Sequence, residues 1–291
     1  MLKYGSFLLL LIGALSTSGQ SSHTTTTASD SKPFVLGWVH ELPSRILNEK
    51  RTLNIYLPEG YKKDDSTRYP VIYLLDGSAD EDFIHIAGLA QFSNFEWVQR
   101  LPKSIVVGIA SVDRRRDFTF PTSIEADKKA YPTTGHAAAF IEFLEKECKP
   151  FVNATYHTNS SATIIGQSLG GLLATQILFT RPQLFNRYII VSPSLWWNNG
   201  SMLEQELPPI NNPSQQPPAI YIAVGKEGLT STTNPHVMEV DANLLADKIK
   251  KWQGRNATVY FDYLPEENHG TILHQAVSNA FKHFYGKNDP Q

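Results

Sequence analysis

Apolar residues alternate with polar ones in parts of the chain and form short continuous runs elsewhere. Residues 51–58 (RTLNIYLP) alternate in the manner of a strand that stops at Pro58. Continuous apolar runs follow at 69–77 (YPVIYLLDG) and 104–111 (SIVVGIAS), and both end in turn residues. Such runs are typical of strands that a parallel sheet buries on both faces.

Strand and helix patterns alternate in the second half of the chain. A helix is predicted at 136–152, a strand at 162–165, and a helix from about 170 to 180 that Pro182 ends. The other expected elements are strands at 187–192, 218–225 and 258–265 and helices at 241–252 and 271–284. This alternation predicts parallel pairing through right-handed crossovers, and hence an α/β fold with a mostly parallel central sheet and helices on both faces.

The first 32 residues have a different composition from the rest. Residues 1–19 combine Lys3, an apolar run and small residues at a potential cleavage site, which predicts a secretory signal peptide. Its apolar run is shorter than the roughly 20 residues of a membrane span, so no span is expected after cleavage, although an uncleaved anchor is the alternative. We expect a disordered Ser/Thr-rich linker at 20–32, one α/β domain at 33–286, a tail at 287–291, and a periplasmic or secreted protein.

Composition narrows the range of partners. The net charge of the 291-residue chain is -2, and no run of like charges exceeds Arg114–Arg116, so we expect no nucleic-acid partner. The single cysteine, Cys148, cannot form an intramolecular disulfide, and we expect it to be a small buried residue. No Cys/His cluster has metal-site spacing, and no cofactor is expected. Nothing in the sequence indicates the oligomeric state.

The segment Gly166-Gln167-Ser168-Leu169-Gly170 matches the pattern G-x-S-x-G. An apolar strand is predicted directly before it and a helix directly after it, which is the context in which this pattern carries a nucleophile. The serine would sit on a strained turn, with its hydroxyl lifted above the sheet. An ordinary turn is the alternative, but the context favours Ser168 as a nucleophile.

Two backbone amides are candidates for an oxyanion hole. The amide of Leu169 opens the helix after the serine and would point to where an oxyanion forms. A second donor is expected from the loop after the strand at 69–77, and the amide of Ser78, which follows Asp76-Gly77, is the candidate. A plain Asp-Gly turn without a catalytic role is the alternative.

A serine hydroxyl needs a base, and His269 is the best placed of the nine histidines. It lies in a loop after the last predicted strand, where enzymes with a G-x-S-x-G serine on this kind of sheet carry their histidine. His274 and His283 fall inside the closing helix, while His236 and His136 come too early in the chain.

The acid that orients the base should follow the penultimate strand, because the chain order is serine, acid, histidine. Glu227, in the stretch GKEG, occupies that position. Asp241 is equally well explained as a helix cap, and Glu266 and Glu267 are too near His269 along the chain. A Ser-His dyad without a firmly held acid is a further alternative.

Two loops at the carboxyl ends of the strands are candidates for substrate binding. Trp196 and Trp197 could form a flat wall for an aromatic acyl group, and packing under the loop explains them equally well. The run Arg114–Arg116 could meet an anionic substrate, although a solvated face is favoured for at least two of these arginines.

Six segments give the chain a family likeness: VIYLLDG, IVVGIAS followed by RRRDFTFP, IIGQSLGGLLA, VSPSLWWNN, IAVGKEG and EENHGT. In this order the chain resembles the esterase-D-like branch of the α/β-hydrolases, especially the small enzymes related to siderophore esterases, from residue 33 to 284. The resemblance implies the α/β-hydrolase fold. The roles that it implies are nucleophile for Ser168, base for His269, acid at Glu227, oxyanion amide at Ser78 and substrate contact at Arg116, whose stretch is similar to the family's R-D-x-T.

The predicted function is that of a serine esterase that hydrolyses a small carboxylic ester through an acyl-enzyme. If both substrate loops bind, a ferric tri-catecholate trilactone would fit, because it is anionic, aromatic and rich in esters. Acyl transfer, as in the mycolyltransferases that share the LLDG stretch, and a catalytically silent binding protein are the alternatives.

Overall fold

The computed structural model describes residues 31–208, 217–253 and 258–286. The predicted signal peptide, most of the predicted linker and the predicted tail lie outside these residues. The chain divides into two units, Met1–Val35 and Leu36–Gln291, and the architecture below is that of the second unit.

Eight strands of the described residues form one sheet, in the order β1-β2-β4-β3-β5-β6-β7-β8. The first two pairings, β1 with β2 and β2 with β4, are antiparallel, and every later pairing is parallel. The strands are β1 (Trp38–Ser44), β2 (Glu49–Tyr56), β3 (Tyr69–Leu75), β4 (Ile105–Ile109), β5 (Thr158–Gln167), β6 (Arg187–Val191), β7 (Ala219–Gly225) and β8 (Val259–Leu264). The mostly parallel sheet confirms the predicted fold class.

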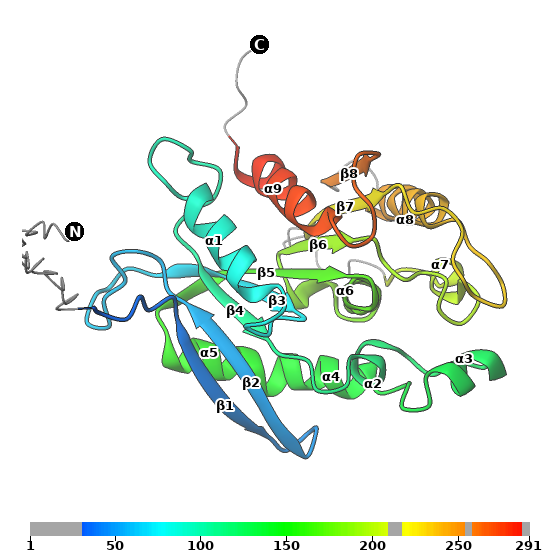
Figure 1. The fold of residues 1–291 in the computed structure, drawn as a ribbon, viewed down its shortest axis with the longest axis horizontal. Coiled ribbons are helices and arrows are strands. Elements are labelled where there is room, and N and C mark those ends of the chain that lie inside the picture. Colours follow the sequence, from blue (N-terminus) through cyan, green and yellow to red (C-terminus); the bar gives the residue numbers. More distant parts are fainter. Residues whose placement is uncertain (1–30, 209–216, 254–257, 287–291) are drawn as a thin grey trace, which may run out of the picture. The chain divides into compact units, whose positions relative to one another are not determined.

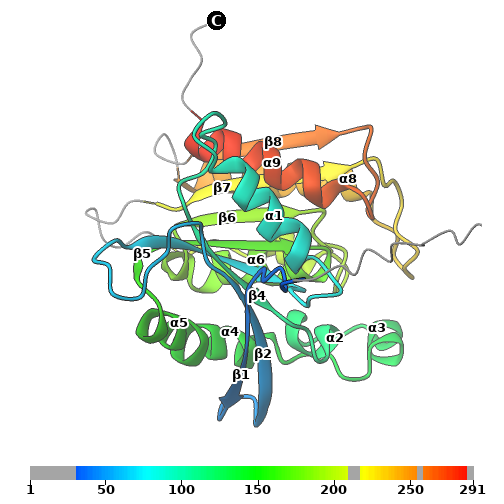
Figure 2. The same cartoon turned by 60° about the vertical axis from the view of Figure 1, so that its left-hand side comes forward.

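Helices cover both faces of this sheet (Figures 1 and 2). One face carries α1 (Phe83–Ser93) and α9 (Ile272–Tyr285). The other face carries α2 (Arg114–Phe118), α4 (Ala137–Phe143), α5 (Lys149–Thr155), α6 (Leu169–Thr180) and α8 (Met238–Gln253). The short helices α3 (Glu125–Ala130) and α7 (Ser201–Glu204) lie in connections. None of the described helices combines the length and apolarity that crossing a bilayer requires.

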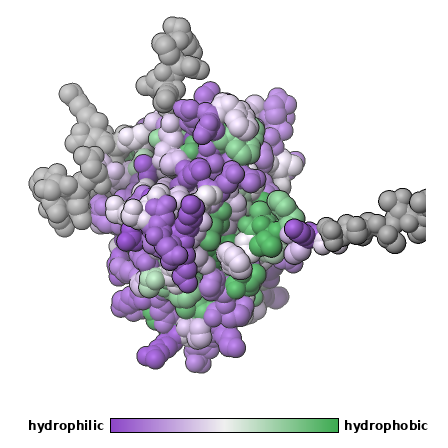
Figure 3. Space-filling view, turned by 90° about the vertical axis from the view of Figure 1, so that its left-hand side faces the viewer, coloured by the Kyte–Doolittle hydropathy of each residue, from purple (hydrophilic) through white to green (hydrophobic). Residues whose placement is uncertain are grey.

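The sheet separates two apolar clusters, and β3 shows why its sequence is apolar without interruption. Val71, Tyr73 and Leu75 belong to the cluster on the α6 side, whereas Ile72 and Leu74 belong to the cluster under α1 and α9. Successive side chains of a strand point to opposite faces, so both sets must be apolar. The apolar side chains are thus largely internal, and the face of the molecule in Figure 3 is mostly hydrophilic, with apolar residues confined to part of it.

The helix predicted at 136–152 occupies Ala137–Thr155, but it is not uniformly α-helical. A π-helical turn at Leu144–Cys148 joins α4 to α5. Cys148 lies in this turn and is fully buried, which confirms it as a small buried residue. Burial raises the pKa of its thiol to about 12, so the group stays protonated and unreactive.

Candidate active site

Ser168 lies on the turn between β5 and α6, at the carboxyl edge of the sheet. Its φ of 59° and ψ of -121° place a non-glycine residue in a strained backbone conformation. A Cβ atom on Gly166 would lie 2.3 Å from the carbonyl oxygen of Gly170, so only glycine lets strand and helix approach so closely. A Cβ atom on Gly170 would find its nearest neighbour at an ordinary 3.5 Å. The turn thus has the geometry of a nucleophile elbow.

His269 and Glu227 come from the two loops that follow β8 and β7. Nδ1 of His269 lies 2.5 Å from Oε2 of Glu227. The carboxylate side chain is only 5% exposed, whereas the imidazole is 47% exposed. The side-chain amide of Gln167 donates to the backbone carbonyl of His269, and so ties the histidine loop to the residue before Ser168.

The carboxylate of Glu227 accepts hydrogen bonds on both oxygens. Oε2 faces His269, while Oε1 accepts from the hydroxyl of Ser192 and from the backbone N–H of Gly225 at 3.3 Å. Burial raises the pKa of Glu227, but the hydrogen bonds from His269 and Ser192 outweigh it and hold the pKa below its ordinary value. The group is therefore ionised at neutral pH and suited to fix the Nδ1–H tautomer of His269.

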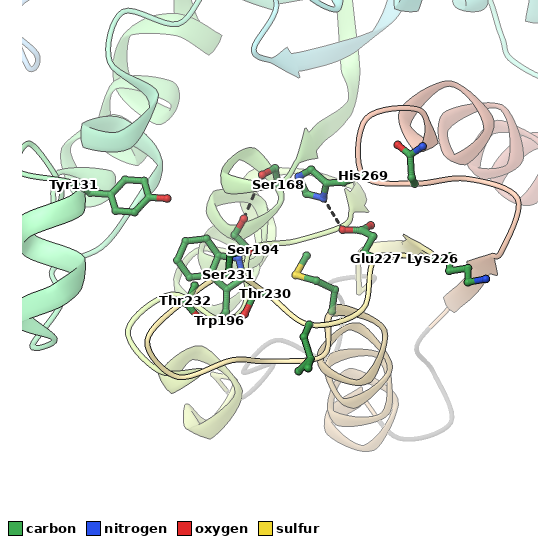
Figure 4. A pocket seen from close by; sticks show the side chains of 13 residues that line it. Tyr131, Ser168, Ser194, Trp196, Lys226, Glu227, Thr230, Ser231, Thr232 and His269 are labelled. Atoms are coloured by element: carbon green, nitrogen blue, oxygen red, sulfur yellow. Dashed lines mark hydrogen bonds and ion pairs between the residues drawn. The ribbon is translucent and has the colours of Figure 1, made fainter.

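The turn with Ser168 and the loops with Glu227 and His269 line one cavity of about 530 Å³ (Figure 4). Ser168, Glu227 and His269 line it, and the figure shows the Ser168 side chain beside the imidazole. The hydroxyl of Ser168 lies 3.3 Å from the hydroxyl of Ser194. Tyr131 also lines the cavity, and its phenol points towards Ser168 (Figure 4). A serine, a histidine and a carboxylate thus share one open site.

The two predicted oxyanion amides lie in neighbouring segments. Leu169 is the first residue of α6, and the loop that carries Ser78 follows β3, the neighbour of β5 in the sheet. Asp76 of that loop lies 3.5 Å from where a Cβ atom on Gly170 would be, so the loop contacts the start of α6. The Ser78 amide donates to the carboxylate of Glu81 at 3.3 Å, and that carboxylate would have to leave before an oxyanion could bind.

The adjacent tryptophans occupy different environments. Trp196 lines the cavity, 6.2 Å from Tyr131 between ring centroids. Trp197 is fully buried, and its indole N–H donates to the carbonyl of Phe120 at 2.8 Å. Only Trp196 can act as a wall for a substrate, and for Trp197 the packing alternative is correct.

Arg116 does not line the cavity. Its guanidinium pairs with Glu49 at 2.7 Å and with Asp117, also at 2.7 Å, and so connects α2 to β2. Arg114 is likewise bound by Asp76. Because Glu49 and Asp117 already bind the guanidinium of Arg116, the substrate contact expected of Arg116 does not fit this geometry. Arg115 contacts one residue of the cavity, since its guanidinium lies 4.8 Å from the ring centroid of Tyr131.

Sequence reasoning missed several side chains of the cavity. Tyr131 follows α3, a segment without a motif, and nothing in the sequence points to it. Ser194 lies within the stretch VSPSLWWNN, where no sequence pattern distinguishes it from an ordinary turn serine. Thr230 and Thr232 bring hydroxyls from the loop after Glu227, and Lys226 is the one Lys or Arg among the described lining residues.

Comparison with known proteins identifies the family. The sequence matches the family described as "Putative esterase" over residues 44–267. The chain belongs to this esterase family. It is 30% identical over 250 residues to the ferri-bacillibactin esterase BesA of Bacillus subtilis (strain 168), an alignment that covers 81% of this chain and 85% of that protein.

Solved structures agree with the assignment. The esterase superimposes on an IroE-like serine hydrolase from Shewanella oneidensis with a TM-score of 0.72 and 29% identity, over 86% of this chain and 80% of that one. For the BES protein from Bacillus cereus the TM-score is 0.74 at 28% identity, over 89% and 98% of the two chains. The protein is therefore a hydrolase of ester bonds with the α/β-hydrolase fold, as the resemblance implied.

Proposed function

We propose that Ser168, His269 and Glu227 form the catalytic triad of this esterase. The observation that carries the proposal is the shared cavity, in which the strained Ser168 lies beside an imidazole whose Nδ1 is bound to a buried carboxylate. With Glu227 on Nδ1, the free Nε2 of His269 is the atom that can accept the serine proton.

The reaction follows from these positions. Ser168 Oγ attacks the ester carbonyl while His269 takes its proton. The oxyanion is held by the amide of Leu169 and, once the carboxylate of Glu81 has left it, by the amide of Ser78. His269 then gives the proton to the departing alkoxide, which leaves as an alcohol. Water, activated by the same histidine, releases the acid and restores the serine.

A fluorophosphonate probe tests the nucleophile. We expect the wild type to be labelled and to hydrolyse short p-nitrophenyl esters, and Ser168→Ala to lose both, with kcat down by about 10⁴-fold or more. Thr180→Ala is a control, because its hydroxyl binds the carbonyl of Gln176 at the far end of the same helix. Equal labelling of wild type and Ser168→Ala would refute the assignment.

For the substrate we propose an aromatic ester of the siderophore type. Support comes from the relative named as a ferri-bacillibactin esterase and from the aromatic side chains of Trp196 and Tyr131 in the cavity. Offset or edge-on contact with an aryl ring is the interaction that such side chains favour. Arg116 plays no part in this proposal.

A panel of esters tests the substrate class. Tri-catecholate trilactones, with and without ferric iron, are compared with short p-nitrophenyl esters, with product formation followed by chromatography. We expect a higher kcat/KM for the trilactones, and Trp196→Ala to reduce it by about tenfold through KM. Efficient hydrolysis of the simple esters with the trilactones left intact would contradict the substrate proposal and leave the triad standing.

We also propose that the protein acts outside the cytoplasm. The support is the composition of residues 1–19, which lie outside the described residues. Mass spectrometry of the mature protein, recovered from periplasm and medium, would detect the shortened chain. An intact N-terminus in a cytoplasmic fraction would contradict the proposal.

A further inference from the structure

Two buried serines lie on the turn that follows β6, on either side of Pro193. Ser192 is 0% exposed and Ser194 is 1% exposed. The hydroxyl of Ser192 donates to Oε1 of Glu227, and the hydroxyl of Ser194 lies 3.3 Å from that of Ser168. One three-residue turn therefore touches both the carboxylate and the nucleophilic serine.

The backbone of this turn is fixed against the nucleophile elbow. Ser192 has a φ of 42°, a left-handed conformation that costs free energy in a non-glycine residue, and its N–H donates to the carbonyl of Ala223 at 2.8 Å. The N–H of Ser194 donates to the carbonyl of Ser168 at 3.0 Å. Pro193 lies so near α6 that a Cβ atom on Gly171 would come within 3.0 Å of its Cα.

The use of the Ser192 donor distinguishes it from an ordinary buried serine. Ser104 is equally buried, and its hydroxyl binds the nearby carbonyl of Pro102 at 2.7 Å. A local carbonyl is the usual partner of such a hydroxyl. Ser192 instead binds a carboxylate that is 35 residues away in the chain, and a hydrogen bond to an ionised acceptor is among the stronger ones.

We propose that Ser192 and Ser194 are positioning residues of the catalytic site, an inference that rests on the proposed triad. Ser192 keeps Glu227 ionised and aligned on Nδ1 of His269. Ser194 holds the hydroxyl of Ser168 in one orientation at the cavity wall. The turn between them fixes the distance between acid and nucleophile.

The pH profile of kcat/KM separates this role from simple packing. Without the Ser192 hydroxyl, Glu227 loses a donor that lowers its pKa, so this carboxylate is protonated at higher pH than in the wild type. In Ser192→Ala we expect kcat to fall about tenfold with KM unchanged, and the acidic limb to move up by roughly half a pH unit. In Ser194→Ala we expect a lower kcat and slower fluorophosphonate labelling, with the acidic limb of the pH profile at its wild-type position. In Ser194→Thr, which restores a hydroxyl, we expect most of the wild-type kcat to return.

Controls keep the test decisive. Ser192→Gly also removes the hydroxyl and suits the positive φ, so it replaces Ser192→Ala if that variant fails to fold. Ser104→Ala removes an equally buried hydroxyl remote from the cavity, and its pH profile should match the wild type. If Ser192→Ala and Ser192→Gly keep the wild-type profile and kcat, the inference is overturned. If the wild type itself is neither labelled nor active on esters, the proposed triad fails instead.

Discussion

Glu227 is a buried carboxylate whose charge is stabilised by hydrogen-bond donors and by the neighbouring imidazole. The Ser192 hydroxyl, the Gly225 N–H and the His269 ring surround its two oxygens. Burial of an unpaired charge costs free energy, and the hydrogen bonds from these donors more than offset that cost, so the pKa of Glu227 is lowered. The loop is fixed in turn by Glu239, which accepts the backbone N–H of Glu227 at 2.8 Å. The histidine thus meets a fixed anion.

Glu227→Gln tests this balance by activity. The amide is close in shape, but it can donate to Nδ1 and so favour the tautomer whose Nε2 carries the proton and cannot act as a base. We expect kcat to fall by about 10² to 10⁴-fold with little change in KM. A loss below twofold in ester hydrolysis would show that Ser168 and His269 act without the acid.

Stability against pH tests the same residue independently. Because the pKa of Glu227 is lowered from 4.5 in the folded protein, the ionised group stabilises the fold above that pH, and this stabilisation is lost as pH falls through the folded-state pKa. Urea unfolding should show Glu227→Gln less stable than the wild type at pH 7. The difference should shrink below pH 4, and a gap that is constant with pH would contradict the expected ionisation.

At the scale of elements, the elbow depends unequally on its two flanking glycines. Gly166→Ala would push a methyl group into the backbone of α6, where the oxygen of Gly170 is 2.3 Å away. We expect the free energy of unfolding to fall by about 3 kcal/mol, because neither backbone can yield. Gly170→Ala is the matched variant, with ordinary contacts and a helical position, and we expect up to about 1 kcal/mol of gain. Thermal unfolding measures both, and equal losses would contradict the asymmetry.

Strands with continuous apolar runs were predictable from the sequence, whereas β1 and α1 were not. β3, β4 and β7 are apolar throughout and β6 is apolar after Arg187, so the sequence identifies them directly. β1 is an edge strand that exposes Trp38 and Val39, and no apolar run marks it. α1 was missed because it exposes Ile84 and Phe92 as well as burying apolar residues, which removes the two-sided pattern of a surface helix.

The candidate site shows the same limit. Ser168, His269 and Glu227 follow strands in a chain order that the fold prescribes, so the sequence could predict where they lie. Trp196 and Trp197 are adjacent in the same turn, and only coordinates reveal that one lines the cavity and the other is buried. Partners distant in sequence decided the environment of Arg116, because Glu49 is 67 residues away.

At the scale of the whole molecule, the charge distribution offers little attraction to an anionic substrate. The net charge is -2, and Lys226 is the one Lys or Arg among the described residues of the cavity, next to the anionic Glu227. Two of the three consecutive arginines are already paired with carboxylates, Arg114 with Asp76 and Arg116 with Glu49 and Asp117. Substrate capture must therefore depend on short-range contacts.

Salt dependence tests this conclusion. Electrostatic steering raises association rates through a long-range field that salt screens, and the field of a paired, nearly neutral surface is weak. We expect kcat/KM for an anionic aromatic ester to change by less than about threefold between 20 and 300 mM salt. A neutral ester of the same acyl group should show the same small change. A tenfold fall in kcat/KM for the anionic ester alone would mean that a basic surface guides the substrate. Arg114–Arg116 would then be the candidate for that surface.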